Sequence, residues 1–426
     1  MFPEMHHARQ TFPRPRLENI QAAVREELGK LQLQRKLRKG ARVAITGGSR
    51  GINNIVAIVR TTVEYLKAQG FQPVLVAAMG SHGGGTAEGQ REVLTSLGFT
   101  PESIQAPILT GAETVEVGRT ASGLVAYINK HVANLDGIVV INRVKIHTAL
   151  VGELHSGLTK SCVVGLGGPS GAEQFHSLGI KELPACLRDI GNILIAKTPI
   201  IGGLGIVENG YEDTARIVAV EPSRFLEEDM KLLRLANELM PSLPAEKLDV
   251  LVVEEMGKNY SGTGMDTNVI GRFRIQGEPE PEKPAIRRIV VLDLSEGSHG
   301  NANGVGLADI VTDKLAGKID LHNTYLNIMT TGFCLRGFLP LHFPSEQQAI
   351  QMAIKSLGLM DPRKLRLMIV PNTLHLDNLY VSEALLPELK GRSNIEVARQ
   401  PIAMQFDRDK NMLNRLLTRA AGHATS

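Results

Sequence analysis

The sequence predicts an α/β fold made of two α/β domains with mainly parallel sheets and an active site in the cleft between them. Short runs rich in Val and Ile recur along the 426 residues and alternate with helical segments, and 43 glycines supply turns. This alternation of strand, loop and helix is typical of a doubly wound sheet. The length is sufficient for two or three domains, each with its own hydrophobic core.

The first series of elements begins near the N-terminus. Each expected strand is an apolar run that ends in a polar or glycine-rich turn, and Thr86 is a suitable N-cap for the helix after the second strand. In order, we expect a helix at 17–37, a strand at 42–46, a helix at 53–69, a strand at 72–79, a strand at 137–144 and a helix at 223–239.

A second series follows the loop MPSLPAEK. Its expected elements are a strand at 248–255, a strand at 288–295, a helix at 308–317, a helix at 345–357 and a strand at 365–372. We therefore predict an N-terminal cofactor-binding catalytic domain over residues 1–244 and a C-terminal α/β domain over 245–395. The last stretch, 396–426, is predicted to be helical and to complete the N-terminal domain.

Composition excludes several classes of protein. The 47 basic and 44 acidic residues are interspersed, and the chain has six Tyr and no Trp, so we expect no nucleic-acid binding. Cys162, Cys186 and Cys334 show no CxxC spacing, which favours a reducing compartment. We find neither a signal peptide nor a run of 18 apolar residues, and we expect a cytoplasmic protein without membrane contact.

Three chemically active side chains follow expected strand ends. Arg50 comes shortly after the first strand, His82 lies in the loop GSHGGGT after the second, and His147 follows the third. In doubly wound sheets, ligands bind at the carboxyl ends of the strands. An arginine there is suited to binding a carboxylate, and a histidine is suited to acid and base catalysis. Each residue alone is also compatible with a surface or structural role.

The window RVKIHTALVGELHSGLTKSCVVGLGGPSGAEQFH, residues 143–176, is unusually dense in reactive groups. It contains His147, His155 and His176 together with Lys160, which lies between glycine-rich turns. A partly desolvated lysine can act as an amine nucleophile. The eight-residue separation of the first two histidines does not fit the HExxH pattern of zinc hydrolases. Their co-occurrence points to a catalytic centre, in which we regard His155 as a bystander.

A competing hypothesis comes from VAITGGSRGI. This stretch is similar to the cofactor loop of short-chain dehydrogenases, where glycines allow close approach to a pyrophosphate. The sequence has Asn53 where a third glycine is expected, and no Tyr is followed by Lys four residues later. An NAD-dependent dehydrogenase thus remains an alternative, although the chain lacks the Tyr and Lys pair that catalyses the reaction in that family.

These motifs together resemble those of the nickel-dependent lactate racemase family. TGGSRGIN occupies the place of the family segment that carries the arginine at Arg50, and AMGSHGGGT is similar to the segment that carries its first catalytic histidine, at His82. IHTALVGELHSGLTK resembles, with about three inserted residues, the segment that places the second catalytic histidine at His147 and the cofactor lysine at Lys160. His176 follows 16 residues later, at the family's spacing for a nickel ligand.

The resemblance implies a racemase or epimerase of a 2-hydroxy acid. Its cofactor is a nickel-pincer nucleotide, which is joined to Lys160 through a thioamide and takes up and returns a hydride. His176 is the implied nickel ligand. Ser156 and Gly157 are expected to contact the nucleotide phosphate, and Arg50 is expected to bind the substrate carboxylate. The expected partners are a small 2-hydroxy acid and the cofactor-maturation enzymes.

The sequence also departs from the family pattern. Gly47 replaces an aspartate near Arg50, and the Gln/Lys pair of the second domain is absent from GKNYSGTGMDTNVIGRF. Lys258 and Asn259 are candidate replacements for binding substrate. We therefore expect a larger or more polar 2-hydroxy acid than lactate, such as a dicarboxylate or a sugar acid. A homologue that binds a nucleotide or metal without catalysis remains a further alternative.

Overall fold

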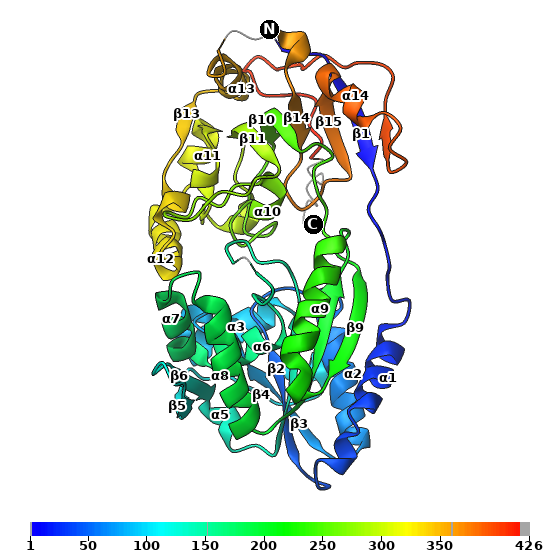
Figure 1. Cartoon of the computed structure of the whole chain (residues 1–426), viewed down its shortest axis with the longest axis vertical. Helices are drawn as coiled ribbons and strands as arrows, with labels where there is room; N and C mark the ends of the chain where they lie inside the picture. The colour runs from blue at the N-terminus through cyan, green and yellow to red at the C-terminus, as the bar shows by residue number, and fades with distance from the viewer. Residues whose placement is uncertain (1, 151, 359–360, 418–426) are drawn as a thin grey trace, which may run out of the picture. The chain divides into compact units, whose positions relative to one another are not determined.

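The computed structural model describes residues 2–150, 152–358 and 361–417. The chain separates into two compact units, Pro13–Met240 and Met1–Phe12 with Pro241–Ser426. We call them the N-terminal unit and the C-terminal unit. Each consists of α-helices and a mainly parallel sheet, which confirms the predicted fold class (Figure 1).

The N-terminal unit is built on a six-stranded sheet with the order β4-β3-β2-β7-β8-β9. Its strands are parallel except for β9, which pairs antiparallel with β8. The strand order reverses between β2 and β7, so this is the point where ligands bind in doubly wound sheets. The strands are β2 (Arg42–Gly47), β3 (Gln72–Ala77), β4 (Ile108–Leu109), β7 (Gly137–Arg143), β8 (Ile200–Glu208) and β9 (Thr214–Val220), with a separate hairpin of β5 (Thr114–Arg119) and β6 (Val125–Asn129).

Helices cover both faces of this sheet (Figure 1). Val43 and Ile45 face one hydrophobic cluster, whereas Ala44 between them belongs to the cluster on the other face. Such strands are buried on both sides, which explains their continuous apolar runs. The helices are α1 (Ile20–Lys30), α2 (Ile55–Ala68), α3 (Ala87–Ser96), α4 (Pro101–Ile104), α5 (Lys130–Ala133), α6 (Leu158–Lys160), α7 (Gly168–Ser177), α8 (Leu183–Lys197) and α9 (Phe225–Glu238).

The C-terminal unit has an eight-stranded sheet with the order β13-β12-β11-β10-β14-β15-β1-β16. The first five strands in this order are parallel, and the last three are joined by antiparallel pairing. The strands are β10 (Lys247–Val253), β11 (Ala285–Val291), β12 (Ile310–Thr312), β13 (Leu341–Phe343), β14 (Leu367–Val370), β15 (Asn378–Ser382), β1 (Met5–Gln10) and β16 (Ile395–Val397). The helices are α10 (Thr267–Ile270), α11 (Asp313–Gly317), α12 (Leu321–Thr331), α13 (Glu346–Lys355) and α14 (Leu386–Leu389).

Both ends of the chain differ from the sequence-based prediction. The N-terminal strand β1 lies between β15 and β16, so residues 2–12 belong to the C-terminal unit. The described part of the predicted helix 396–426 is not helical, and the remainder, 418–426, lies outside the described residues. This stretch instead folds back on itself through an antiparallel bridge between Phe406 and Met412. Its apolar side chains pack on the C-terminal core, namely Met404, Phe406, Met412 and Leu416. The prediction of a helix at 308–317 is also partly wrong. The β-branched residues Ile310–Thr312 form β12, and the helix α11 begins only at Asp313.

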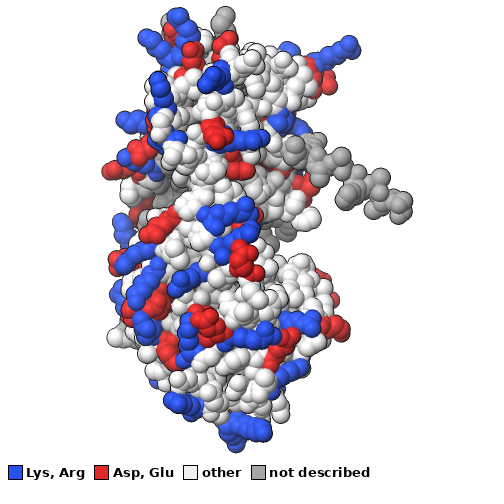
Figure 2. Space-filling model, turned by 90° about the vertical axis from the view of Figure 1, so that its right-hand side faces the viewer, with Lys and Arg blue, Asp and Glu red and all other residues white. Residues whose placement is uncertain are grey.

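Charged side chains are mixed on the surface. Figure 2 shows Lys and Arg interspersed with Asp and Glu on the face in view, as the formal net charge of +3 suggests. Among the described residues, no helix has both the length and the apolar character needed to cross a membrane.

Candidate active site

Lys160 ends the short helix α6, whose N-terminus is held by a buried carboxylate. Asp229 on α9 is fully buried and accepts hydrogen bonds from the backbone N–H groups of Leu158 and Thr159, both at 2.8 Å. Gly157 precedes the helix with φ +116°, and a Cβ atom there would lie 2.1 Å from Asp229 Oδ1. Because only glycine permits this approach, the contact depends on Gly157 and fixes the start of the helix that carries Lys160.

Further hydrogen bonds tie this segment to the end of β7. The Gly157 carbonyl accepts from Asn142 Nδ2 at 2.8 Å, and Ser156 Oγ accepts from the Lys145 backbone N–H at 3.3 Å. Burial raises the pKa of Asp229 to about 6, although its two backbone hydrogen bonds act in the opposite direction. The structure thus gives Gly157 a packing role, and the contacts of Ser156 and Gly157 with a phosphate stay predictions.

The segment after Lys160 brings it close to the His82 loop. Ser161–Leu166 forms a turn of π-helix, a form that is frequent at functional sites. Within it, the Gly165 carbonyl accepts from Gly80 N–H at 3.2 Å, and a Cβ on Gly165 would lie 2.7 Å from the Ala78 carbonyl oxygen. Since Gly80 is two residues before His82, these contacts place two predicted catalytic segments side by side.

The His82 loop is tightly folded. Gly83, Gly84 and Gly85 all have left-handed φ values, of +67°, +65° and +65°. A Cβ on Gly83 would lie 2.4 Å from the carbonyl carbon of Gly89, in the first turn of α3. These glycines permit close backbone packing, and the His82 side chain is exposed at the surface.

Lys160 is half-buried, and among the described residues its amine forms no hydrogen bond or ion pair. Its Nζ lies 5.8 Å from the centroid of the Phe175 ring. Burial, and secondarily the positive charge of Arg50, lowers the pKa of Lys160 to about 8. A minor fraction of the amine, roughly a tenth, is therefore neutral at pH 7, far more than for an ordinary lysine, and the neutral amine is the form that acts as a nucleophile.

Arg50 is a second cation without an anionic partner in the described part of the chain. Part of the Arg50 side chain is exposed, but neighbouring protein atoms desolvate its charged group. This desolvation, together with the positive charge of Arg143, lowers the pKa of Arg50. Arg143 is paired with the largely buried Glu208, so its own charge is compensated. Arg50 and Lys160 consequently leave uncompensated positive charge at the carboxyl ends of β2 and β7.

Two histidines lie close enough to Lys160 for its charge to act on them. Burial, followed by the Lys160 charge, lowers the pKa of both His155 and His176 to about 4. His155 is only 5% exposed, and its Nδ1 has no hydrogen-bond partner among the residues that the structure describes. His176 retains an exposed face and packs edge-on against Phe175, with ring centroids 5.4 Å apart. Both imidazoles are therefore neutral at pH 7.

His147 is half-buried and held by its own backbone. Its Nδ1 accepts hydrogen bonds from the N–H groups of Ala149 at 3.1 Å and Leu150 at 3.2 Å. An accepting Nδ1 carries no proton, so the neutral ring is protonated on Nε2. In this arrangement Nε2 is a hydrogen-bond donor. His147 could act as a base through Nε2 only in the tautomer that carries its proton on Nδ1.

Lys258 and Asn259 lie in the C-terminal unit, shortly after β10. Lys258 Nζ donates to the Gly262 carbonyl at 2.6 Å and to Asn327 Oδ1 at 2.7 Å. Asn259 is exposed, and its Oδ1 accepts from Ser295 Oγ at 2.5 Å. Both side chains are polar groups at a strand end, and their role toward substrate stays a prediction.

Two residues of this site are missing from the sequence-based prediction. The signal for Asp229 was present, because it falls among the buried positions of α9 with Phe225 and Leu232. An aspartate on the apolar face of a helix needs a polar partner. His155 had been considered a bystander, since nothing in the sequence shows that its ring points inward.

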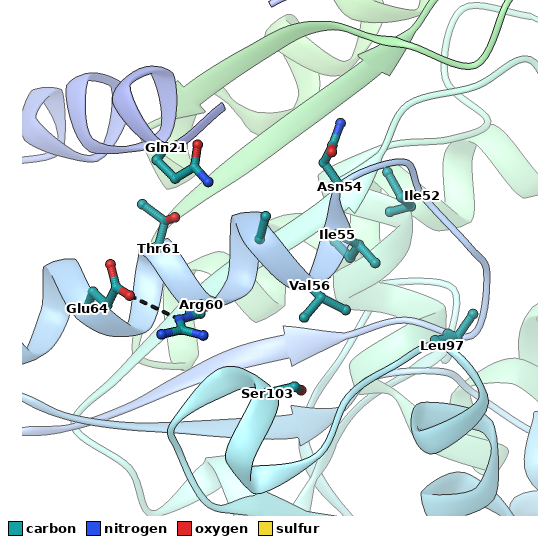
Figure 3. Close-up of a pocket in the computed structure, with 11 residues that line it drawn as sticks. Gln21, Ile52, Asn54, Ile55, Val56, Arg60, Thr61, Glu64, Leu97 and Ser103 are labelled. Atoms are coloured by element: carbon teal, nitrogen blue, oxygen red, sulfur yellow. Dashed lines mark hydrogen bonds and ion pairs between the residues drawn. The ribbon is translucent and has the colours of Figure 1, made fainter. Parts of the chain in front are cut away.

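A pocket of about 710 Å³ lies elsewhere in the N-terminal unit, between α1, α2 and neighbouring loops (Figure 3). Arg60 and Glu64, which form an ion pair at 3.2 Å, lie at one side of it. None of the predicted site residues lines this pocket, and it contains no obvious catalytic group. Its lining comprises Gln21, Ile52, Asn54, Ile55, Val56, Ala57, Arg60, Thr61, Glu64, Leu97 and Ser103.

Comparison with known proteins agrees with the resemblance of the motifs. Residues 6–185 match the family model of the lactate racemase N-terminal domain. The lactate racemase apoprotein from Thermoanaerobacterium thermosaccharolyticum is similar in structure, with a TM-score of 0.53 at 13% identity over 86% of this chain and 94% of that one. A protein from Thermotoga maritima gives a TM-score of 0.51 at 14% identity over 85% and 98%. These structures show the shared fold, and no curated protein sequence matches significantly.

Proposed function

We propose that this chain, whose residues 6–185 match the family model of the lactate racemase N-terminal domain, is a lactate racemase-like enzyme that racemises or epimerises a 2-hydroxy acid with a nickel-pincer nucleotide. The observation that carries the proposal is the environment of Lys160. A half-buried amine with a pKa of about 8 lies near two neutral imidazoles and the unpaired Arg50. This combination suits covalent attachment of an anionic group.

The residues present fit such a cofactor. In the described ranges, no three His, Cys, Asp or Glu side chains are grouped so as to hold a metal ion. The bound cofactor would supply sulfur donors of its own to the nickel, so that one imidazole from the chain would suffice as the protein ligand. His176, neutral and partly exposed, would be that ligand, and Lys160 would carry the covalent link. The unpartnered His155 Nδ1 also supports the binding of a polar group near this segment.

The chain's own residues would bind the substrate and transfer protons, while the bound cofactor supplies the acceptor and donor of hydride. Arg50 would bind the substrate carboxylate through its guanidinium. His82 and His147 would exchange a proton with the 2-hydroxyl oxygen, because inversion needs an acid and a base that exchange roles. His147 would first donate a hydrogen bond from Nε2 to that oxygen, since its Nδ1 is engaged by backbone N–H groups.

The proposed substrate is larger or more polar than lactate. Lys258 and Asn259 offer an ammonium and a carboxamide where the family's Gln/Lys pair is absent. These groups would bind additional oxygen atoms of a dicarboxylate or a sugar acid. Cofactor-maturation enzymes are the partners that this chemistry would require.

Mass spectrometry of protein produced together with those maturation enzymes tests the proposal. We expect a modified Lys160 peptide and stoichiometric nickel, and a Lys160→Arg variant provides the control that cannot form the amide. Interconversion of 2-hydroxy acid stereoisomers should then be lost in both His82→Ala and His147→Ala. An unmodified Lys160 peptide without nickel would rule out the cofactor, and an unchanged rate in either histidine variant would remove that residue from the mechanism.

A further inference from the structure

Exposed apolar side chains are concentrated in one segment of the C-terminal unit. Among the described residues, eight large apolar side chains are more than half exposed, and all except Leu413 lie between Leu321 and Leu341. The helix α12 contributes Leu321, Tyr325, Leu326 and Met329, and the chain that follows it contributes Phe338, Leu339 and Leu341. We call these seven residues the α12 surface.

The two parts of the α12 surface are contiguous. The helical turn Cys334–Gly337 packs on α12, because a Cβ atom on Gly337 would lie 3.0 Å from the Ile328 side chain. Phe338 follows this turn directly, and Leu341 begins β13, the strand at one end of the sheet order, which is paired with β12. Figure 1 shows α12 and β13 along the same border of the C-terminal unit. The α12 surface therefore joins an apolar helix face to the edge of a sheet.

Hydrogen bonds on the opposite side of α12 keep the helix from turning its apolar face inward. Asn327 Oδ1 accepts from Lys258 Nζ at 2.7 Å. Thr324 is buried, and its Oγ1 accepts from the backbone N–H of Ala302 at 3.0 Å. Rotation of the helix would break both contacts, so the exposed apolar residues are a fixed feature of the surface.

The size and composition of the α12 surface are those of a protein interface. Each of its seven side chains is more than half exposed, so together they present roughly 700 Å² of side-chain surface. Monomeric proteins rarely expose a contiguous apolar patch of more than a few hundred Å². A standard interface buries about 800 Å² on each partner, and Tyr, Phe and Met are enriched in its core.

The segment that forms the α12 surface contributes no exposed formal charge. From Leu321 to Pro344 the only Lys, Arg, Asp or Glu is Arg336, although such residues make up 21% of the chain. Arg336 is 2% exposed, and its Nε donates to the Phe273 carbonyl at 2.8 Å. A highly charged partner would therefore find no opposite charge on this segment, whereas two copies of it meet without like-charge repulsion.

We propose that the α12 surface is the interface of a symmetric homodimer. A two-fold axis places the same patch on both subunits, so the apolar residues of one copy cover those of the other. The edge strand β13 fits this symmetry, because two copies related by a two-fold axis pair antiparallel and satisfy backbone groups that an edge leaves open. The dimer also covers the helix whose Asn327 accepts from Lys258.

Sedimentation velocity of the purified protein between about 1 and 100 μM tests the proposal. We expect the wild type to approach twice the chain mass of 46.2 kDa at the highest concentration. Leu326→Glu places one carboxylate from each subunit in the interface and should raise the dissociation constant at least about tenfold. Leu413→Glu is the matched control, because Leu413 is 58% exposed, compared with 63% for Leu326, and lies outside the α12 surface. The control should leave the dissociation constant unchanged, and circular dichroism verifies folding.

A wild type that stays monomeric over the whole range overturns the proposal. Binding of that monomer to phosphatidylcholine vesicles, lost in Leu326→Glu, would assign the face to a lipid surface instead. A dimer that persists undiminished in Leu326→Glu, or that both substitutions weaken equally, also overturns the proposal, because the subunits then do not associate specifically through the α12 surface.

If Leu326→Glu does not fold, hydrogen exchange of the wild type decides the matter. The backbone amides of α12 should exchange more slowly as the protein concentration rises over the same range. Exchange in α12 that is independent of concentration overturns the proposal. These measurements use neither nickel nor substrate, so their outcome is separable from that of the proposed function.

Discussion

The Lys160 segment and the His82 loop lie side by side in the N-terminal unit, but they are held in different ways. Gly157 lets a buried carboxylate approach the backbone before Lys160, so a charged side chain organises that segment. Gly83 lets one stretch of backbone pack on another, and no charge takes part. The Lys160 segment, which a buried carboxylate organises, carries the candidate nucleophile. The His82 loop, which backbone contacts organise, presents an exposed histidine.

The largest effect is expected from Gly157→Ala. The new Cβ would lie 2.1 Å from Asp229 Oδ1 at a φ that alanine avoids, so the carboxylate must move and the helix N-terminus loses its partner. We expect a loss of about 4 kcal/mol in the free energy of unfolding. Urea unfolding followed by circular dichroism measures this loss.

Gly152→Ala is the matched control, because Gly152 has φ +114° and a Cβ added there would meet open space. We expect a loss of about 1–2 kcal/mol in that variant. Equal losses in the two variants would contradict the role of Asp229.

A smaller loss is expected from Gly83→Ala in the His82 loop. Its Cβ would lie 2.4 Å from a backbone carbon of Gly89, but no buried charge would lose its partner. About 3 kcal/mol is expected, compared with about 1 kcal/mol for Gly84→Ala, which shares the left-handed φ and has open space. If the two variants unfold at the same urea concentration, the loop is looser than its backbone contacts indicate.

The sequence predicts the framework of both segments but not the means by which they are held. The runs at 42–46 and 137–144 identify buried parallel strands, and polar residues at strand ends indicate where the site lies. The Asp229 contact joins residues about 70 positions apart, and β1 pairs with strands near the other end of the chain. Such pairings depend on packing between distant segments, which local periodicity does not encode.

The two histidines after β7 show the same limit. His147 was predicted as an acid–base residue from its place after a strand, whereas His155 was regarded as a bystander. Burial of the ring and an unpartnered nitrogen distinguish His155, and both depend on the tertiary structure. The roles of the individual site residues therefore stay predictions, while the fold class is confirmed.

The pH dependence of the unfolding free energy of Asp229→Asn tests whether a buried carboxylate distinguishes the Lys160 segment from the His82 loop. The folded state raises the pKa of Asp229 from 3.8 to about 6, so it binds a proton more tightly than the unfolded chain does. The stability contributed by this group is then greatest below pH 4, falls by about 3 kcal/mol as the pH rises to 6, and is constant above that. The difference in unfolding free energy between wild type and Asp229→Asn should follow this curve. A difference that rises with pH would mean that the carboxylate is stabilised in the folded state.

The smallest effect concerns Arg50→Gln, which leaves the Lys160 segment folded and changes only its electrostatics. Burial is the main cause of the lowered Lys160 pKa and Arg50 is the second, so removing the guanidinium should move this pKa upward from about 8 without restoring an ordinary lysine. Competitive acetylation across pH 7–11 measures the midpoint, and labelling at pH 8 should fall about twofold. Arg38→Gln, an exposed arginine in the same unit, is the control and should leave the midpoint in place. A midpoint unchanged in Arg50→Gln would show that burial alone tunes Lys160. The contrast with the His82 loop would then lie in desolvation and not in the charges at the strand ends.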